Sequence, residues 1–522
     1  MPTTPRSDPA GEALRPVSAA ELLDPVAYPH PVARARIVET NTSLVVLTGD
    51  YAYKIKKPVR LEFLDASTLA RRRLLCEEEL RLNTRLAPEL YLEVVPIVRA
   101  AAGIRVGAAG EAVEYAVRMR QFDGSQELSA LLERGAVDAS EIADLARRVA
   151  RFHAAAPRDA GREGANTARM RAAVLGNLAT LLAHVGGELG APGLGKLIDW
   201  THDVLQRAAA RFRAREAAGF VRECHGDLHS RNIVRWRGRL LPFDCLEFDP
   251  ALRWIDVMSD VAFLFMDLSG RARADLAAQF LDAYLDESGD YRGVALLPFY
   301  AVYRALVRAM VDALAAEKTA ADERTRWVFS DRARARIHTA AGFAKPRPPP
   351  LIAMHGPSGA GKSWLSERLV PRIGAVRVRS DVERRRLAGD APPGHDSRWD
   401  ALTYARLAYC AAGCLAGGVP TIVDATFGRR ADRNRLRALA AAARVPLIFL
   451  SCTADRAQLA ANIAARRRRG DDPSDADLAV LDVQLAAMEP FGDDERAQVV
   501  EIASGGPDAV DRAGAAIGAL PR

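Results

Sequence analysis

LIAMHGPSGAGKS, residues 351–363, is the stretch of this sequence from which a fold can be read. It begins with a short apolar run and continues with residues 356–363, which fit the pattern G-x-x-x-x-G-K-[ST]. Glycines let a backbone curl until its amides and the start of the next helix face phosphate oxygens. The stretch therefore predicts a strand, a phosphate-binding loop and a helix. A glycine-rich turn with a solvated lysine is the alternative interpretation.

The side chains of this loop suit a nucleoside triphosphate with its metal. We expect Lys362 to reach the β and γ phosphates of ATP and the Ser363 hydroxyl to bind Mg²⁺. The predicted nucleotide-binding residues are Gly356, Pro357, Ser358, Gly359, Ala360, Gly361, Lys362 and Ser363.

Strands and helices alternate after the loop. Apolar strands are predicted at 351–356, 375–380, 420–426 and 446–452, with helical segments between them, which indicates a parallel sheet covered by helices. Asp424 ends one strand and is placed to face Mg²⁺; a plain strand-terminating residue is its alternative role. Asp381 follows another strand and either accepts a proton from a hydroxyl substrate or caps the next helix.

Four consecutive arginines, 466–469, precede the loop sequence GDDPSDAD. Such a run can close over a transferring phosphoryl group and neutralise its charge. Because four side chains on one helical turn cannot all point inward, we assign this role to Arg466 and Arg469 and expect the others to be solvated.

Together these features resemble the small P-loop kinases, in particular the zeta-toxin and gluconate-kinase-like group, over about residues 351–500. The resemblance implies a P-loop NTPase fold of three layers, α/β/α, that phosphorylates a hydroxyl of a small molecule.

The domain boundary is predicted at residues 344–350, where four of five consecutive residues are proline, because such a segment continues neither a helix nor a central strand. We expect a frayed amino terminus over 1–25, a first domain over 26–343 and a second over 351–522. In the first domain, residues 42–57 predict a hairpin, 67–87 a helix, 114–122 a strand and 140–215 helices.

HGDLHSRN, residues 225–232, is followed by two short strands that end at Asp244. In this spacing Asp227 can accept the proton of an attacking hydroxyl, while Asn232 and Asp244 can bind the Mg²⁺ that bridges the phosphates. A turn capped by Asp and Asn is the alternative interpretation of the loop.

This pattern resembles the aminoglycoside phosphotransferase and choline kinase-like family. The resemblance implies a two-lobed, protein-kinase-like fold, α+β in class, with a lysine on an early strand paired to a helix glutamate. Lys54 and Glu79 stand at those places, although Lys56 lies on the same strand face and is also open to the role. The segment before Lys54 departs from the family because it has no glycine-rich loop.

Composition limits the remaining function classes. The net charge is +7, but arginines are spread along the chain, which argues against a nucleic-acid partner. Only seven residues are lysines, so those that remain mark sites that need a compact ammonium group. The six scattered cysteines predict reduced core thiols, and without a signal sequence or membrane span we expect a cytoplasmic protein.

The sequence thus predicts an ATP- and Mg²⁺-dependent phosphotransferase with two nucleotide-binding domains, acting on a hydroxyl of a small metabolite. The alternative function is an ATP-binding sensor with little or no transferase activity.

Overall fold

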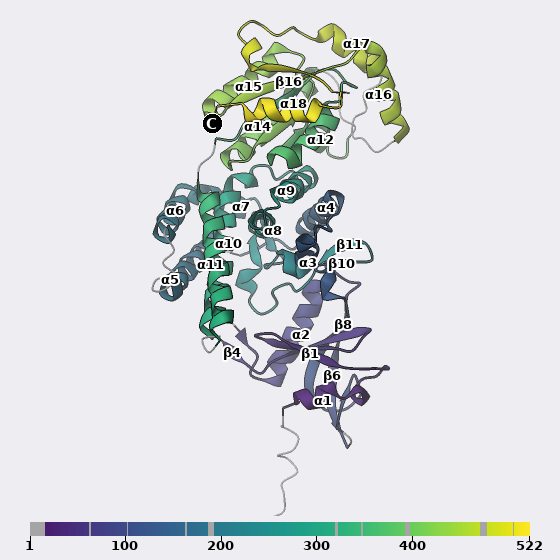
Figure 1. The fold of residues 1–522 in the computed structure, drawn as a ribbon, viewed down its shortest axis with the longest axis vertical. Helices are drawn as coiled ribbons and strands as arrows, with labels where there is room; N and C mark the ends of the chain where they lie inside the picture. The colour runs from purple at the N-terminus through teal and green to yellow at the C-terminus, as the bar shows by residue number, and fades with distance from the viewer. Residues whose placement is uncertain are drawn as a thin grey trace, which may run out of the picture. The chain divides into compact units, whose positions relative to one another are not determined.

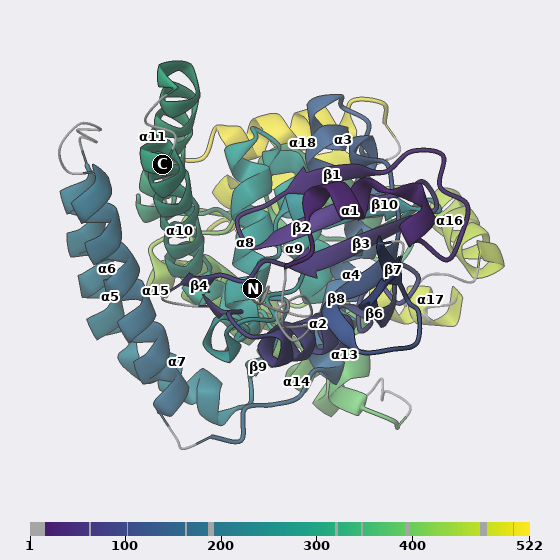
Figure 2. The same ribbon diagram turned by 90° about the horizontal axis from the view of Figure 1, so that it is seen from below.

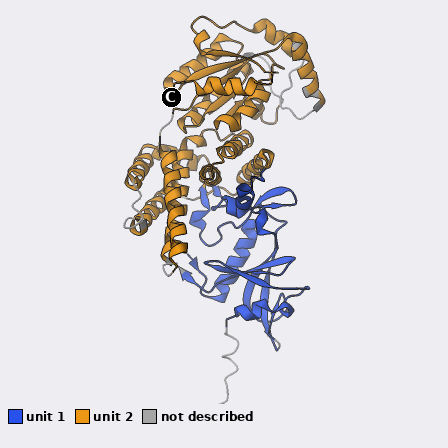
Figure 3. Ribbon diagram, in the orientation of Figure 1, with its two compact units in different colours: residues 1–137, 222–255 blue, residues 138–221, 256–522 orange. Residues whose placement is uncertain are grey.

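The computed structural model (Figure 1) describes residues 16–61, 64–101, 103–161, 164–185, 193–318, 322–345, 348–391, 397–469, 478–504 and 506–521. Within these ranges the chain forms two compact units (Figure 3), one of residues 1–137 and 222–255, the other of residues 138–221 and 256–522. The predicted boundary at 344–350 lies inside the second unit by number, and part of that segment, 346–347, is outside the described residues. It stays a prediction.

The first unit is built on an antiparallel sheet with the strand order β1-β2-β3-β8-β6-β7, and Figure 2 shows these strands side by side. The predicted hairpin is confirmed, because β2 pairs antiparallel with β3 across the turn Thr48-Gly49-Asp50. The strands are β1 Arg36–Glu39, β2 Ser43–Leu47, β3 Tyr51–Lys56, β6 Tyr91–Ala100, β7 Gly103–Val106 and β8 Ala112–Arg120.

Helix α2, Leu69–Asn83, packs against β8 and β6 of this sheet and lies within the predicted helical range 67–87, but it ends four residues earlier than predicted. Thr68 is its N-cap, because the Thr68 side chain accepts a hydrogen bond from the Arg71 amide. Shorter elements of the unit are α1 Ala19–Leu23, β4 Arg60–Leu61, β5 Leu64–Asp65, α3 Leu128–Glu133, β10 Ile233–Trp236 and β11 Arg239–Pro242. The last two form the strand pair that was expected before Asp244.

The second unit begins with helices, as predicted for residues 140–215. They are α4 Ala139–Ala155, α5 Ala165–Val185, α6 Leu194–Arg207, α7 Ala209–Ala217, α8 Val257–Gly270, α9 Ala274–Ser288, α10 Leu297–Lys318 and α11 Glu323–Ala344. Two short strands, β9 Val221–Glu223 and β12 Trp254–Asp256, pair with each other at the changeover between the units.

One stretch of the second unit, Gly293–Glu317, is long and apolar enough to cross a membrane by length and composition alone. Within the described residues, 61% of its most apolar window is buried inside the protein, mainly as α10. Helix α10 packs along α11, α8 and α5, so its apolar surface is covered by protein. Burial of this kind is what a core helix shows.

The rest of the second unit is a parallel sheet of five strands in the order β14-β15-β13-β16-β17. The alternating sequence pattern predicted the parallel sheet and four of its strands, but not β17. The strands are β13 Leu351–His355, β14 Val376–Arg379, β15 Thr421–Asp424, β16 Leu447–Thr453 and β17 Val499–Ala503. The helices are α12 Lys362–Ile373, α13 Ser380–Ala388, α14 Ser397–Ala416, α15 Arg430–Ala443, α16 Arg456–Arg469, α17 Leu478–Ala487 and α18 Ala509–Gly518.

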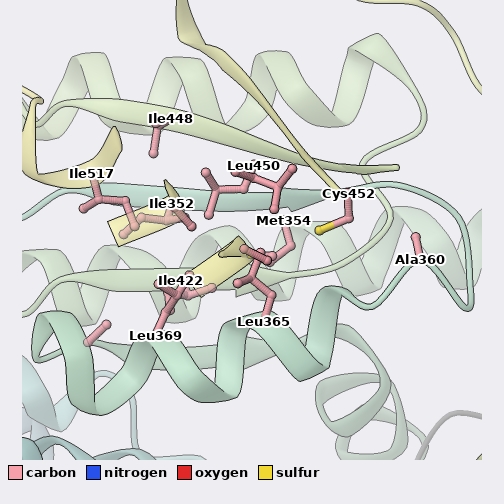
Figure 4. Close-up of a cluster of buried hydrophobic side chains, with 14 of the residues drawn as sticks. Ile352, Met354, Ala360, Leu365, Leu369, Ile422, Ile448, Leu450, Cys452 and Ile517 are labelled. Atoms are coloured by element: carbon pink, nitrogen blue, oxygen red, sulfur yellow. The ribbon is translucent and has the colours of Figure 1, made fainter. Parts of the chain in front are cut away.

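The core of this sheet positions the phosphate-binding loop. Every residue of β13 is buried, as expected for a central parallel strand with both faces covered. Figure 4 shows Ile352 and Met354 of β13 against Leu365 and Leu369 of α12, with Ile517 of α18 at the far end of the cluster. The strand and helix that flank the loop are therefore fixed to one another by packing.

Candidate functional site

The loop between β13 and α12 has a backbone that only glycine can adopt at its ends. Gly356 has φ of 129°, and a Cβ atom there would lie 2.5 Å from the Cys452 carbonyl oxygen. Gly361 has φ of 80°, and a Cβ atom would lie 2.5 Å from Ser504 Oγ. Positive φ and lack of space both exclude a side chain at these positions. The loop therefore curls as the sequence predicted, directly ahead of α12.

Polar groups of the loop are bonded within the protein. Lys362 Nζ donates to the carbonyl oxygens of Gly356 and Pro357, at 2.8 and 2.9 Å. The Ser358 amide donates to Gln484 Oε1 of α17 at 2.8 Å. Backbone amides of such a loop can donate to phosphate oxygens. Gln484 Oε1 therefore occupies a position that a phosphate oxygen could also take. Contact of Lys362 with phosphates stays a prediction.

A cavity of about 800 Å³ opens beside the loop. Seven residues that the sequence singled out line it together: Ser358, Gly359, Gly361, Lys362, Ser363, Asp381 and Asp424. The wall also contains charged and aromatic side chains that sequence reasoning missed, namely Trp364, Arg379, Arg384, Asp400, Tyr404, Arg429 and Asp432. Arg379 had a signal, since it lies two residues before Asp381 at the carboxyl end of a predicted strand, where ligands of parallel sheets bind.

Asp381 lies in the first turn of α13, whose N-cap position is Arg379. The competing interpretation of Asp381 as the N-cap is therefore wrong. Its carboxylate still suits the positive end of the helix dipole, so the position serves both helix and cavity.

Asp424 ends β15, and its Oδ2 atom accepts a hydrogen bond from Ser366 Oγ at 2.9 Å. Ser366 stands on α12 one turn after Ser363, so the helix brings a hydroxyl and a carboxylate to the same end of the sheet. Oxygen donors of these two kinds are what Mg²⁺ takes beside a bound phosphate, and they fit the ion chemically.

The arginine run forms the end of α16, whose backbone is helical up to Arg469. The side chains of Arg466, Arg467 and Arg469 and the loop 470–477 lie outside the described residues. Closer to the loop, Gln458, Asn462 and Ala465 of the same helix line the cavity. Asn462 Nδ2 donates to the Gly359 carbonyl oxygen at 2.8 Å, which ties α16 to the loop.

In the first unit, the loop 225–232 orients Asp227 through its neighbours. His229 Nδ1 accepts from the Arg231 amide, which leaves Nε2 as the protonated nitrogen, 3.3 Å from Asp227 Oδ2. Asn232 Nδ2 donates to the same carboxylate oxygen at 2.9 Å and to the Asp227 carbonyl at 3.1 Å. The Asn232 amide oxygen therefore points away from Asp227 and is the atom suited to a metal.

His225 has a structural part in this loop. Its Nε2 lies 2.9 Å from the Phe243 carbonyl oxygen, and its Nδ1 accepts from the Asp227 amide at 3.3 Å. The imidazole thus connects the loop to the residue that precedes Asp244, which gives His225 an orienting role.

Both candidate lysines bind Glu79, which is fully buried on α2. Lys54 Nζ lies 2.7 Å from Glu79 Oε1 and also contacts the Asp244 carboxylate. Lys56 Nζ lies 2.5 Å from Glu79 Oε2 and 2.5 Å from Glu247 Oε1. Burial alone would raise the pKa of Glu79, but the two ammonium groups outweigh it and hold that pKa below its usual range.

The two lysines differ in what else they face. Lys54 shares Asp244, whose side chain is 42% exposed and whose backbone has φ of 63°. A non-glycine residue in this conformation costs energy and is frequent at functional sites. Lys56 is only 2% exposed and faces Glu247, at 8%. Glu247 was missed by the sequence analysis, although it lies three residues after Asp244.

Two family models match the two regions. A phosphotransferase enzyme family model matches residues 65–297, and an AAA domain model matches residues 351–491. A gluconokinase from Sinorhizobium meliloti is 23% identical and has a TM-score of 0.26, covering 33% of this chain and 93% of its own. A choline/ethanolamine kinase family protein from Mesorhizobium loti is 15% identical and has a TM-score of 0.35, covering 61% and 89%.

Mycobacterial proteins are similar to this chain along nearly its whole length. Uncharacterized proteins of Mycobacterium tuberculosis and Mycobacterium bovis are each 30% identical over 479 residues, which cover 88% of this chain and 92% of theirs. The chain therefore belongs to the same family as these mycobacterial proteins, and it joins a kinase-like phosphotransferase region to a P-loop kinase-like AAA domain.

Proposed function

We propose that this protein transfers the γ-phosphoryl group of ATP to a hydroxyl of a small metabolite, with the P-loop region as the principal site. One observation carries the proposal: the loop lysine, the hydroxyl and carboxylate suited to Mg²⁺, and Asp381 all line one cavity of about 800 Å³. That volume is in the range of small-molecule sites, roughly 300–1,000 Å³. A site that only binds nucleotide does not need Asp381.

Each residue that the sequence predicted for this site has a defined part in the proposal. The loop amides and Lys362 bind the phosphates, while Ser363 and Asp424 hold Mg²⁺, which supplies positive charge at the transferring group. Asp381 accepts the proton of the attacking hydroxyl. Arg466 and Arg469 neutralise the charge that spreads over the phosphoryl oxygens.

The first unit is proposed as a second ATP site of related chemistry. Lys54, held by Glu79, reaches toward the phosphates, and Asn232 with Asp244 holds Mg²⁺. Asp227 is the proposed base, oriented by His229 and Asn232. Of the two lysines we assign phosphate contact to Lys54, because Lys54 shares Asp244 while Lys56 is enclosed with Glu247.

A sensor role is the second candidate for the first unit alone. The turn between β1 and β2 is Thr40-Asn41-Thr42, and it contains no glycine that would let a backbone close over phosphates. Nucleotide held at such a site could regulate the chain without fast transfer. We also propose a cytoplasmic location, in agreement with the buried environment of α10.

The test is a transfer assay with γ-labelled ATP against a panel of hydroxylated metabolites, run on the full-length chain. Lys362→Ala should lower transfer by on the order of a hundredfold or more if the P-loop site is active. Asp227→Ala should remove any transfer that persists in Lys362→Ala. Wild-type rates in Lys362→Ala, with loss in Asp227→Ala, would move the reaction to the first unit. No labelled product with any acceptor, together with MgATP binding, would favour the sensor.

A further inference from the structure

The edge strand of the P-loop sheet is covered by a helix from the phosphotransferase region. Strand β14 ends the sheet order, and an edge strand leaves backbone amides without strand partners. The Arg377 amide of β14 donates to Asp282 Oδ1 of α9 at 2.6 Å, and the Arg377 guanidinium donates to Asp282 Oδ2 at 2.8 Å. Asp282 is 1% exposed. One buried carboxylate therefore holds both the backbone and the side chain of the edge strand.

The next turn of α9 repeats this contact closer to the cavity. Asp286, four residues after Asp282, has Oδ2 3.4 Å from the Arg379 guanidinium, and Arg379 is two residues after Arg377. Four helical residues advance about 6 Å and two strand residues about 6.6 Å, so the helix and the strand stay in register. Arg379 lines the cavity beside Asp381. Helix α9 thus contacts Arg379, a residue of the cavity wall.

Close packing fixes α9 and the segment that follows it. Arg386 of α13 donates to the Asp286 carbonyl oxygen at 2.6 Å. On α14, a Cβ atom added at Gly413 would lie 2.5 Å from the Tyr291 carbonyl oxygen. Such distances leave no room for sliding, because a protein core does not deform by an ångström without cost. The Asp286 carboxylate consequently sits at a fixed place relative to β14.

We propose that Asp286 is a positioning residue of the P-loop site: it holds the Arg379 guanidinium at the cavity wall, so that the phosphotransferase region completes the site of the AAA domain. The Arg379 side chain is 19% exposed. Without Asp286, it could adopt several rotamers. An oriented guanidinium can meet an anionic group of the acceptor or of the transferring phosphate without reorganisation. Its effect on turnover rests on the proposed function, whereas its effect on Arg379 itself does not.

The first experiment measures Arg379 directly. Full-length wild type, Asp286→Ala, Asp286→Glu and the control Asp275→Ala are treated with phenylglyoxal, and modification of Arg379 is followed by peptide mass spectrometry. Asp275 is also on α9, but it pairs with Arg273 at the start of the helix. We expect modification several times faster in Asp286→Ala, because the ion pair that protects the guanidinium is gone. Asp286→Glu and Asp275→Ala should stay close to wild type.

The second experiment measures ATP turnover in chains that also carry Asp227→Asn, so that the P-loop site is the source. Asp286→Ala should lower kcat on the order of tenfold to a hundredfold, as misplacement of a reacting geometry by about an ångström does. Its KM for MgATP should change little. Arg379→Ala should cause a similar loss, and the double variant should be no worse than Arg379→Ala, because both changes remove one interaction.

The outcomes separate the two proposals. Faster modification of Arg379 in Asp286→Ala, in a protein that shows no ATP turnover, would contradict the proposed function and support the positioning of Arg379 by Asp286. Unchanged modification in Asp286→Ala, or losses that add in the double variant, would overturn the positioning even if transfer is found. Melting temperatures of all variants are measured first, and if Asp286→Ala fails to fold, Asp286→Asn takes its place because it keeps the shape of the side chain.

Discussion

Lysine is scarce in this chain, and three of its seven lysines make several close polar contacts each. Lys54 and Lys56 share the buried Glu79, and Lys362 bonds two carbonyl oxygens of its own loop. A compact ammonium fits such places, where a planar guanidinium would not. The sequence identified these three positions from composition and spacing. It could not separate Lys54 from Lys56, because strand alternation puts both on one face and only Asp244 and Glu247 distinguish them.

A stability experiment distinguishes the two lysines. Lys56→Ala should lower the free energy of unfolding by about 3 kcal/mol or more, because the buried Glu79 carboxylate then keeps only one of its two ammonium partners and Glu247 loses its ion pair with Lys56. Lys54→Ala should cost less stability but reduce any transfer at the first unit. The measurement is urea unfolding of the full-length chain. Lys57→Ala is the control: Lys57 pairs with the exposed Glu39, and such surface pairs contribute about 1 kcal/mol or less. Equal losses in Lys56→Ala and Lys57→Ala would contradict the assignment.

At the scale of elements, periodicity predicted the hairpin β2–β3, the helix α2 and the β13-loop-α12 unit. Each of these is defined by contacts close in sequence: a turn, an N-cap at Thr68, glycines at Gly356 and Gly361. The pairing of α9 with β14 was not predicted. It depends on contacts of Asp282 and Asp286 with strand residues about a hundred positions away. No local sequence pattern in α9 or β14 indicates which element it packs against.

Two glycines in different helices test how closely α14 is packed. Gly413→Ala should destabilise the protein by about 1–3 kcal/mol, because the added methyl group would overlap the Tyr291 carbonyl oxygen. Gly342→Ala in α11 is the matched change, since a Cβ atom there meets no atom within 4 Å. It should stabilise by roughly 0.5–1 kcal/mol through helix propensity. Thermal unfolding of both variants measures the difference, and equal signs would argue against a tight contact.

For the whole molecule, the predicted order of a phosphotransferase region followed by a P-loop region is confirmed, while the compact units divide the chain at other places than the predicted boundary. The second unit joins helices of the phosphotransferase region to the P-loop sheet, through contacts such as those of Asp282 and Gly413. The proline-rich composition predicts a spacer, but it does not predict which surfaces on either side of the spacer are in contact. These contacts are made by α9 and α14.

Cleavage at the spacer tests this organisation. With a protease site inserted between residues 344 and 350, the two pieces should stay associated during size-exclusion chromatography after cleavage, because the α9–β14 contacts do not depend on the covalent connection. The control is the same cleaved chain with Asp282→Ala and Gly413→Leu, in which separation is expected. Separation of the cleaved wild type at micromolar concentration would show that the contacts are too weak to hold the unit.

All six cysteines are free and buried, as the sequence analysis expected. Burial raises the pKa of the Cys76 and Cys452 thiols to about 12, so the reactive thiolate is rare in the native state. Cys76, Cys224 and Cys245 belong to the first unit, and Cys410, Cys414 and Cys452 to the second. Alkylation by a maleimide therefore requires local opening of the structure. The three cysteines of each unit report on the opening of that unit, independently of the three in the other unit.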